Sequence, residues 1–292
     1  MFCIASTLAL GRSYAFVRIP LNSPRWSRSL VTIKNSVKEA TITSTESITP
    51  PSRTIVLPSI FEQWLDIELP EGRCIGVKLK EPDSKDDITP ELLSDIYHPE
   101  EIAFGLNQTE AISRSFWLGR LALRLAVLKQ TDQNPEYPIL KDSHGRPQLL
   151  GGEIFGSISH KQEVGIALVS KQSDTIGVGI DIEHTLRPGK RSIATRVLTD
   201  NEQQQLGKIP GISPEEEVML RFSLKEAIYK AAHPLLCQYV AFKEAEVTPH
   251  PDGTATCKWL LESGADKSIA SLDAHWKKLD DYGYFLTSAR AQ

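Results

Sequence analysis

One helix is signalled more completely than any other element of this chain, and it constrains what can pack around it. Ser213 is a favoured N-cap residue, Pro214 suits the first helical position, and acids fill the first turn. A buried stripe follows at helical spacing, formed by Leu220, Leu224, Ala227, Ile228 and Ala231. The pattern predicts an amphipathic helix over residues 214–232 that ends before Pro234.

Strand-like segments lie on both sides of this helix in the sequence. Two apolar runs at 163–170 and 175–183 are separated by a polar turn, which predicts a β-hairpin. Other strand-like runs lie at 73–80, 239–248, 254–262 and 282–288. Additional helices are predicted at 99–129, at 191–198 and after the capping box of Thr199 and Glu202. Helices mixed with antiparallel strands favour an α+β fold over a doubly wound parallel sheet.

The overall composition excludes several kinds of partner. The formal net charge of −4 over 292 residues gives no reason to expect nucleic-acid binding. No window approaches the roughly 20 apolar residues that span a bilayer, so no membrane partner is expected. The four cysteines form no CxxC pair, which excludes an ordinary structural zinc site.

The first forty residues differ from the rest of the chain. Six basic residues precede the first acid, Glu39; they are Arg12, Arg18, Arg25, Arg28, Lys34 and Lys38. Such leaders are typical of mitochondrial or plastid transit peptides, so we expect a transit leader at 1–40. The alternative is a disordered tail or a misassigned start. Residues 41–59, rich in Thr, Ser and Pro, are predicted to be a linker, and residues 60–292 to fold.

Asp181 and Glu183 lie two residues apart at the end of an apolar strand. The period-2 geometry of a strand puts both carboxylates on one face. Mg²⁺ is commonly held by one or two carboxylates together with water and substrate phosphate. The alternative is a solvated strand end.

Side chains in four further segments are either ordinary structural residues or members of a binding site. Glu226 and Lys230, one turn apart on the helix and next to Lys225, suit a metal–diphosphate site or form a surface ion pair. Ser159 and His160 are adjacent, so in a strand their side chains point apart and a direct dyad is not expected. Arg146 in the turn at 142–147 and Arg120 on the helix at 99–129 are ordinary surface arginines or phosphate contacts.

These segments form an ordered set. SISH at 157–160, GIDIE at 179–183 and FSLKEAIYK at 222–230 together resemble the 4′-phosphopantetheinyl transferase superfamily. The spacing is similar to its long single-chain type, which activates surfactin and enterobactin synthetases. FWLGRLAL, HGRP and the YVAF segment at 239–242 add to the resemblance, which covers about residues 100–250.

The resemblance implies two similar α+β halves, about 60–170 and 171–292, related by a pseudo-twofold axis with a coenzyme A cleft between them. It implies a monomeric enzyme that moves 4′-phosphopantetheine from coenzyme A to a serine of an apo acyl or peptidyl carrier protein and releases 3′,5′-ADP. The implied Mg²⁺ ligands are Asp181, Glu183 and Glu226. Glu226 or a metal-bound water is the implied base, and Lys230 assists proton transfer. The implied coenzyme A contacts are Arg120, Arg146, Ser159, His160, Lys225 and Lys230.

Two other functions compete with this one. A metal-dependent nuclease or phosphohydrolase would place a lysine shortly after Glu183, where His184 and Thr185 stand. A catalytically silent module that binds coenzyme A or a carrier would have lost some of the acids and lysines, and all of them are present.

Overall fold

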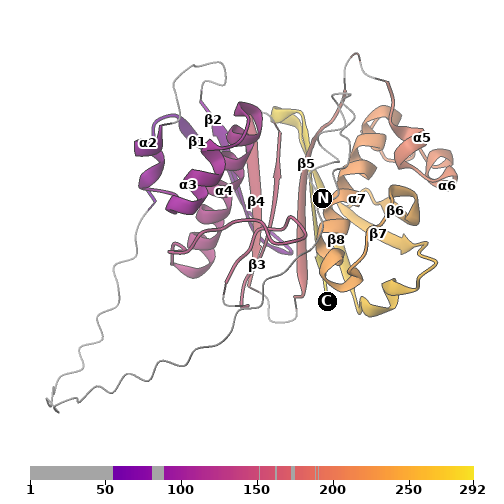
Figure 1. Cartoon of the computed structure of the whole chain (residues 1–292). Coiled ribbons are helices and arrows are strands. Elements are labelled where there is room, and N and C mark those ends of the chain that lie inside the picture. Colours follow the sequence, from indigo (N-terminus) through magenta and orange to yellow (C-terminus); the bar gives the residue numbers. More distant parts are fainter. Residues whose placement is uncertain are drawn as a thin grey trace, which may run out of the picture. The chain divides into compact units, whose positions relative to one another are not determined.

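The computed structural model describes residues 55–80, 89–150, 152–161, 163–171, 175–187, 189 and 191–292 (Figure 1). The leader expected at 1–40 and most of the linker expected at 41–59 lie outside the described residues. Both of these expectations stay predictions.

The first half of the described chain is a four-stranded antiparallel sheet in the order β1-β2-β4-β3. Its strands are β1 (Phe61–Leu69), β2 (Gly72–Leu79), β3 (Phe155–His160) and β4 (Val164–Ser170). Between β2 and β3 come the helices α2 (Pro90–Ser94), α3 (Pro99–Leu106) and α4 (Glu110–Thr131). The helix α4 packs on β2, β3 and β4, and its buried residues join theirs in one hydrophobic core.

The second half is a five-stranded antiparallel sheet in the order β5-β9-β8-β7-β6. Its strands are β5 (Gly177–His184), β6 (Ala245–Pro249), β7 (Thr254–Trp259), β8 (Leu272–Leu279) and β9 (Tyr284–Ala291). The helices are α5 (Ala194–Val197), α6 (Asp200–Gln204) and α7 (Pro214–Leu236), with short 3₁₀ turns at Phe242–Glu244, Ala265–Ser268 and Asp280–Tyr282. The long helix α7 packs on β5 and β9 around a second core.

The two halves share a topology. In each, the strand that precedes the helices pairs antiparallel with the last strand of the half: β2 with β4, and β5 with β9. That last strand also pairs with the one before it, β3 or β8. The expected α+β class is therefore confirmed, and each half is a sheet covered by one long helix.

A third hydrophobic cluster joins the two sheets, because it draws Ile166 and Leu168 from β4 and Ile180 and Ile182 from β5. The strand β4 is consequently buried on both faces, which explains its continuous apolar run. The edge strands β3 and β5 also meet: the Ser157 hydroxyl accepts a hydrogen bond from Ile180 N–H at 3.1 Å and the Ser159 hydroxyl from Ile182 N–H at 3.3 Å.

The hairpin predicted from 163–170 and 175–183 is wrong. The two strands form, but β4 pairs with β2 and β3 in the first sheet, whereas β5 pairs with β9 in the second. An apolar run that is buried on both faces does not show which strand is its partner.

Two helix boundaries also differ from the prediction. The helix expected at 99–129 is two helices, α3 and α4, and Thr109 is the N-cap residue of the second. The helix α7 continues through Pro234 to Leu236, because a proline in the last turn removes few helix hydrogen bonds and Cys237 N–H still reaches His233 O at 2.9 Å. The strands β1, β3 and β8 were not predicted.

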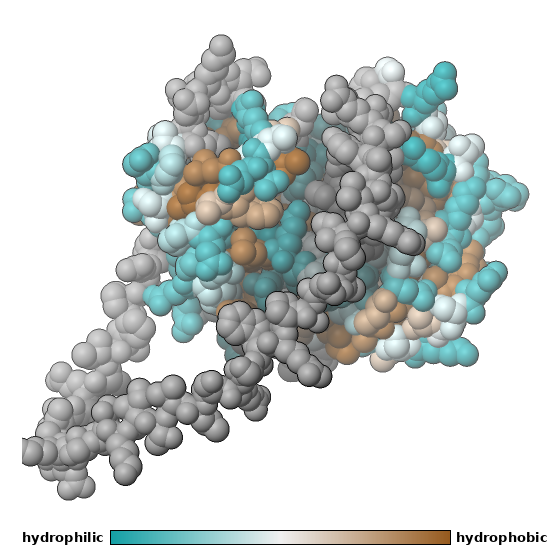
Figure 2. Space-filling view, viewed as in Figure 1, coloured by the Kyte–Doolittle hydropathy of each residue, from teal (hydrophilic) through white to brown (hydrophobic). Residues whose placement is uncertain are grey.

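None of the helices in the described part of the chain combines the length and the apolar character that crossing a membrane requires. On the face shown in Figure 2, hydrophilic side chains alternate with separate small hydrophobic patches.

Candidate active site

Two glycines bring the strand β5 against the helix α7. A Cβ added to Gly179 would lie 1.8 Å from the carbonyl oxygen of Ala227, and one added to Gly177 would lie 2.1 Å from that of Ala231. Only glycine allows this backbone approach. The contact brings the carboxylates at the end of β5 beside the polar residues of α7.

Asp181 is the centre of the polar cluster that results, and only 4% of it is exposed. Its Oδ1 accepts hydrogen bonds from Ser159 Oγ at 2.8 Å and from Lys230 Nζ at 2.9 Å. Its Oδ2 accepts one from Ser223 Oγ at 2.8 Å. The sequence segments SISH, GIDIE and FSLKEAIYK therefore meet at one buried carboxylate.

Glu183 lies on the same strand and forms a hydrogen-bonded ion pair with Lys161. Burial raises the pKa of Glu183, and the nearby Asp181 carboxylate raises it further, while Lys161 opposes both effects. The cluster thus contains two carboxylates that repel each other and a lysine for each of them.

Glu226 adds a third carboxylate from α7. Burial raises the pKa of Glu226 to about 7, and the charges of Asp181 and Glu183 add to the rise, against the lowering effect of Lys230. A carboxyl group with a pKa near neutrality can exchange a proton at physiological pH, as a general base must.

His160 faces the cationic side of this cluster. Burial lowers the pKa of His160 to about 4, and Lys230, Lys161 and Lys141 lower it in the same direction. The imidazole is therefore neutral at pH 7. Three ammonium groups around a neutral ring suit an anionic ligand such as a phosphate.

The three carboxylates of the cluster are a donor set that suits Mg²⁺. Carboxylate oxygens are the ligands that Mg²⁺ prefers. A cation beside them would relieve the repulsion by which Asp181 raises the pKa of Glu183 and both raise the pKa of Glu226. Among the residues that the structure describes, however, no three His, Cys, Asp or Glu side chains are gathered as a ready metal cluster. The lysines occupy carboxylate oxygens instead, so the chemistry fits Mg²⁺ and the side chains would have to rearrange.

Arg146 lies on a loop that faces the end of α7. It pairs with Asp142 at 2.8 Å. Burial of His233 lowers the pKa of its imidazole, and the charge of Arg146 lowers it further. The rings of His144 and His233 are 5.1 Å apart. Arg146 is thus close to the second half and partly exposed.

Two of the expected coenzyme A contacts lie elsewhere. Arg120 is buried in the core of the first half, where its Nε donates to Ile139 O and its guanidinium stands 5.0 Å from the Phe116 ring. Lys225 is buried in an ion pair with Glu202. Both side chains point into packed protein, because they belong to the buried faces of α4 and α7.

Three residues near the cluster were not singled out in the sequence: Lys161, Lys141 and Ser223. Ser223 could have been found, because it lies three residues before Glu226 and seven before Lys230, on one helix face. Lys141 could not, since only the fold places it near His160. Lys161 follows His160 directly, but nothing in the sequence pairs it with Glu183.

Comparison with protein families gives one match: residues 177–283 match the family described as the 4′-phosphopantetheinyl transferase superfamily. The match begins at the first residue of β5 and contains Asp181, Glu183, Glu226 and Lys230.

Three named proteins are similar to the chain. The 4′-phosphopantetheinyl transferase Svp of Streptomyces mobaraensis is 32% identical over 146 residues, 49% of this chain and 54% of that protein. The 4′-phosphopantetheinyl transferase PptT of Mycobacterium tuberculosis is 30% identical over 41% of this chain and 52% of that protein. The 4′-phosphopantetheinyl transferase Npt of Nocardia iowensis is 28% identical over 65% of this chain and 87% of that protein. The matched segments thus span about half the length of the first two relatives.

Two solved structures also match part of the chain. An apo-ACPS structure is 21% identical, with a TM-score of 0.30 over 39% of this chain and 94% of that chain. An ACPS–CoA complex from Chronobacterium ammoniagenes is 22% identical, with a TM-score of 0.29 over 39% of this chain and 95% of that chain.

Proposed function

We propose that this protein transfers 4′-phosphopantetheine from coenzyme A to a serine of an apo carrier protein, because residues 177–283 match the 4′-phosphopantetheinyl transferase superfamily. The observation that carries the proposal is the meeting of three motif segments at Asp181, whose carboxylate binds Ser159, Ser223 and Lys230. The names of the three relatives support the same reaction.

In this reaction the carrier serine oxygen attacks the β-phosphorus of coenzyme A. The bond from that phosphorus to the bridging oxygen breaks, and 3′,5′-ADP leaves. Glu226 takes the serine proton as the general base. The ammonium groups of Lys230 and Lys161 offset the charge on the phosphate oxygens. Neutral His160 donates a hydrogen bond to a phosphate oxygen.

We propose Asp181, Glu183 and Glu226 as the residues that hold Mg²⁺. The ion would offset negative charge on the diphosphate. In the protein itself, the hydroxyl groups of Ser159 on β3 and Ser223 on α7 hold the two oxygens of the Asp181 carboxylate.

The proposal is tested by incubating the purified protein with coenzyme A, Mg²⁺ and an apo acyl carrier protein and weighing the carrier by mass spectrometry. We expect the carrier to gain one phosphopantetheine group. If carriers of the fatty-acid, polyketide and peptide-synthetase types all stay unmodified, the protein is not this transferase.

The Asp181→Ala variant tests the site, and we expect it to lose transfer while keeping its fold. Asp273→Ala is a matched control, because Asp273 lies on β8 of the same sheet and pairs with Arg290 at 2.7 Å near the surface. Full activity in Asp181→Ala would show that the site is misplaced. Hydrolysis of coenzyme A without a carrier would favour a phosphohydrolase, and binding without transfer a silent module.

We also propose that residues 1–40 direct the protein to mitochondria or plastids. The support is the cluster of basic residues and the absence of acids before Glu39. A fluorescent protein fused behind residues 1–40 tests this; a diffuse cytoplasmic signal would contradict it.

A further inference from the structure

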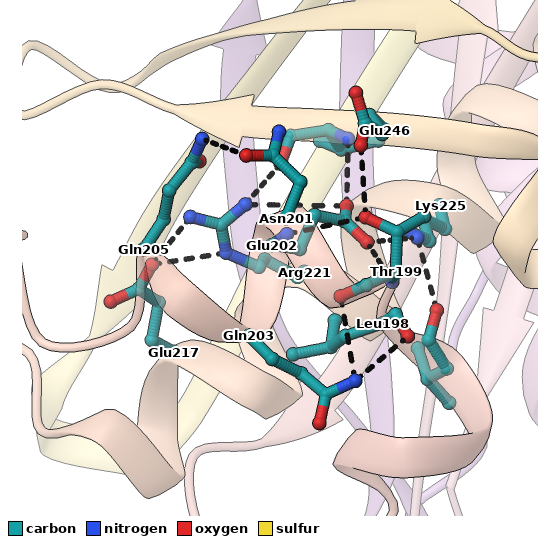
Figure 3. Close-up of polar contacts among 12 residues, drawn as sticks. Leu198, Thr199, Asn201, Glu202, Gln203, Gln205, Glu217, Arg221, Lys225 and Glu246 are labelled. Atoms are coloured by element: carbon teal, nitrogen blue, oxygen red, sulfur yellow. Dashed lines mark hydrogen bonds and ion pairs between the residues drawn. The ribbon is translucent and has the colours of Figure 1, made fainter.

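Lys225, which the resemblance assigned to coenzyme A, uses its whole ammonium group inside the protein (Figure 3). Its Nζ donates to Glu202 Oε2 at 2.6 Å, to Phe242 O at 2.7 Å and to Val197 O at 3.0 Å. These are the three hydrogen bonds that an ammonium group can donate. The Lys225 side chain is 3% exposed and that of Glu202 is 1% exposed.

Glu202 is in turn held by the protein backbone. It is the N3 residue of the capping box of α6, and its Oε2 accepts a hydrogen bond from Thr199 N–H at 2.8 Å. Its Oε1 accepts one from Val247 N–H on β6 at 2.8 Å. Lys225 and Glu202 therefore join α6, β6 and the Phe242 segment to α7.

The first half contains the same arrangement. Glu101 is the N3 residue of the capping box of α3, and its Oε2 accepts from His98 N–H at 2.9 Å and from the Arg124 guanidinium. Arg124 also donates to Pro135 O at 2.6 Å and to Tyr137 O at 3.2 Å, in the segment after α4. The Arg124 and Glu101 side chains are 2% and 0% exposed.

The two pairs correspond in sequence spacing as well as in geometry. Lys225 follows Glu202 by 23 residues, and Arg124 follows Glu101 by 23 residues. In both halves the same glutamate oxygen accepts from the helix N-cap and from a cation of the long helix. The residue after Lys225 is Glu226, whereas the residue after Arg124 is Leu125. The pair is thus common to both halves, and the candidate active site belongs to one.

A phosphate contact would require Lys225 to leave this arrangement. Its departure would leave Glu202 Oε2 and two backbone carbonyls without their ammonium donor, and among the described residues only Arg221, 4.0 Å from Glu202 Oε1, would remain as a cation beside this carboxylate, which is unfavourable. The first half keeps the equivalent pair although it offers no acid at the next position. A role within the fold accounts for both pairs, and ligand binding accounts for neither.

We propose that Lys225 is a positioning residue that does not contact coenzyme A. Together with Glu202, it anchors one turn of α7 to α6 and to the Phe242 segment, and that turn is the one on which Glu226 lies. The proposal rests on the proposed function, because it assigns Glu226 to the transfer site. It gives Glu202 a second role, beyond the capping box that the sequence indicated.

The experiment compares Lys225→Met, Lys225→Arg, Glu202→Gln and the double variant of Met at 225 and Gln at 202. The unfolding temperature of each variant is measured first. Its kcat and its KM for coenzyme A are then measured well below that temperature. We expect Lys225→Met and Glu202→Gln each to lower kcat by about tenfold, with KM for coenzyme A within about threefold of the wild type. The double variant should be no worse than either single one, because both remove one pair. Lys225→Arg should recover most of kcat, as arginine fills this place in the first half.

Arg124→Met and Glu101→Gln are the matched controls. They should lower the unfolding temperature as much as the variants of the second pair, yet leave kcat unchanged, because Leu125 takes no part in transfer. If Lys225→Met does not fold, Lys225→Arg and Glu202→Gln decide the question by the same measurements.

Three results would overturn the proposal. The first is a tenfold or larger rise in KM for coenzyme A in Lys225→Met with kcat retained. The second is a normal kcat in Glu202→Gln. The third is a failure of Lys225→Arg to recover activity. The unfolding temperatures of Lys225→Met, Glu202→Gln, Arg124→Met and Glu101→Gln can be measured without any carrier. An inactive wild type would therefore refute the transferase function and leave the two-pair arrangement standing.

Discussion

His160 shows how one side chain in the cluster couples its charge to the stability of the fold. Its folded-state pKa of about 4 lies below the ordinary value of 6.5, because burial and then the lysines disfavour the imidazolium. Between these two values the folded state binds fewer protons than the unfolded state, so stability falls as the pH falls from 6.5 to 4.

We predict that the His160→Gln variant lacks this part of the pH dependence. Urea unfolding at pH 7 and pH 5 should show the wild type losing about 1–2 kcal/mol more than the variant. His250→Gln is the control, since His250 is half-buried, contacts Thr256 outside the cluster and should leave the difference unchanged. Equal losses in His160→Gln and the wild type would show that the imidazole is not held neutral.

Lys161 is expected to compete with the proposed metal ion. Its ammonium group occupies Glu183. We predict that Lys161→Met binds Mn²⁺, titrated by electron paramagnetic resonance, about three- to tenfold more tightly than the wild type, because one cation leaves the site. Coenzyme A should bind more weakly, since a phosphate contact is lost.

Lys277→Met, which removes an exposed lysine of β8, should change neither affinity. Weaker Mn²⁺ binding in Lys161→Met would show that Lys161 does not occupy a metal position.

At the residue scale, the sequence predicted what depends on local geometry. The spacing of Asp181 and Glu183 put two carboxylates on one strand face, and both now raise the pKa of Glu226. The burial of Arg120 was missed, because a periodic pattern cannot tell a partly buried helix from α4, whose residues 116–127 are all buried.

The contact between β5 and α7 controls the site at the scale of elements. A methyl group on residue 179 would collide with the carbonyl of Ala227, a backbone atom that cannot turn away. The helix would have to move off the strand, and Glu226 and Lys230 would move with it.

We predict that Gly179→Ala destabilises the protein by about 2–4 kcal/mol and lowers transfer by more than tenfold in the remaining folded protein. Gly119→Ala is the control: its methyl group meets only the Ile158 side chain, at 2.7 Å, and alanine favours helix at this position of α4. Chemical denaturation and the carrier assay measure both variants. Wild-type activity in Gly179→Ala would show that the close approach is not needed.

Element types were easier to predict than their pairing. The capping box at Thr199 and the N-cap residue Ser213 marked the starts of α6 and α7 correctly. The assignment of β4 and β5 to different sheets depends on contacts with β2 and β9, far away in the sequence, and no local pattern carries that information.

At the scale of the whole described molecule, the junction of the two sheets determines how close the SISH segment lies to the GIDIE segment. The strands β3 and β5 are edge strands of different sheets, and side-chain hydroxyl groups join them in place of a backbone ladder. On another part of the junction, the buried Glu71 accepts a hydrogen bond from Ser288 Oγ at 2.7 Å and contacts His275 Nδ1 at 2.5 Å. The alternation of serine and apolar residues in β3 was visible in the sequence, but its partner was not.

The hydroxyl group of Ser157 offers the clearest test of this junction, because Ser157 is buried and has no part in the proposed chemistry. We predict that Ser157→Ala destabilises the protein by about 1–3 kcal/mol, since it leaves the Ile180 N–H buried without its acceptor. Ser94→Ala, which removes a hydroxyl from the exposed end of α2, should change stability by less than about 0.5 kcal/mol. Because Ile180 precedes Asp181, Ser157→Ala should also lower the transfer rate, and Ser94→Ala should not. A Ser157→Ala protein as stable as the wild type would mean that the apolar cluster alone holds the sheets together, and the serines of SISH would then serve the site and not the junction.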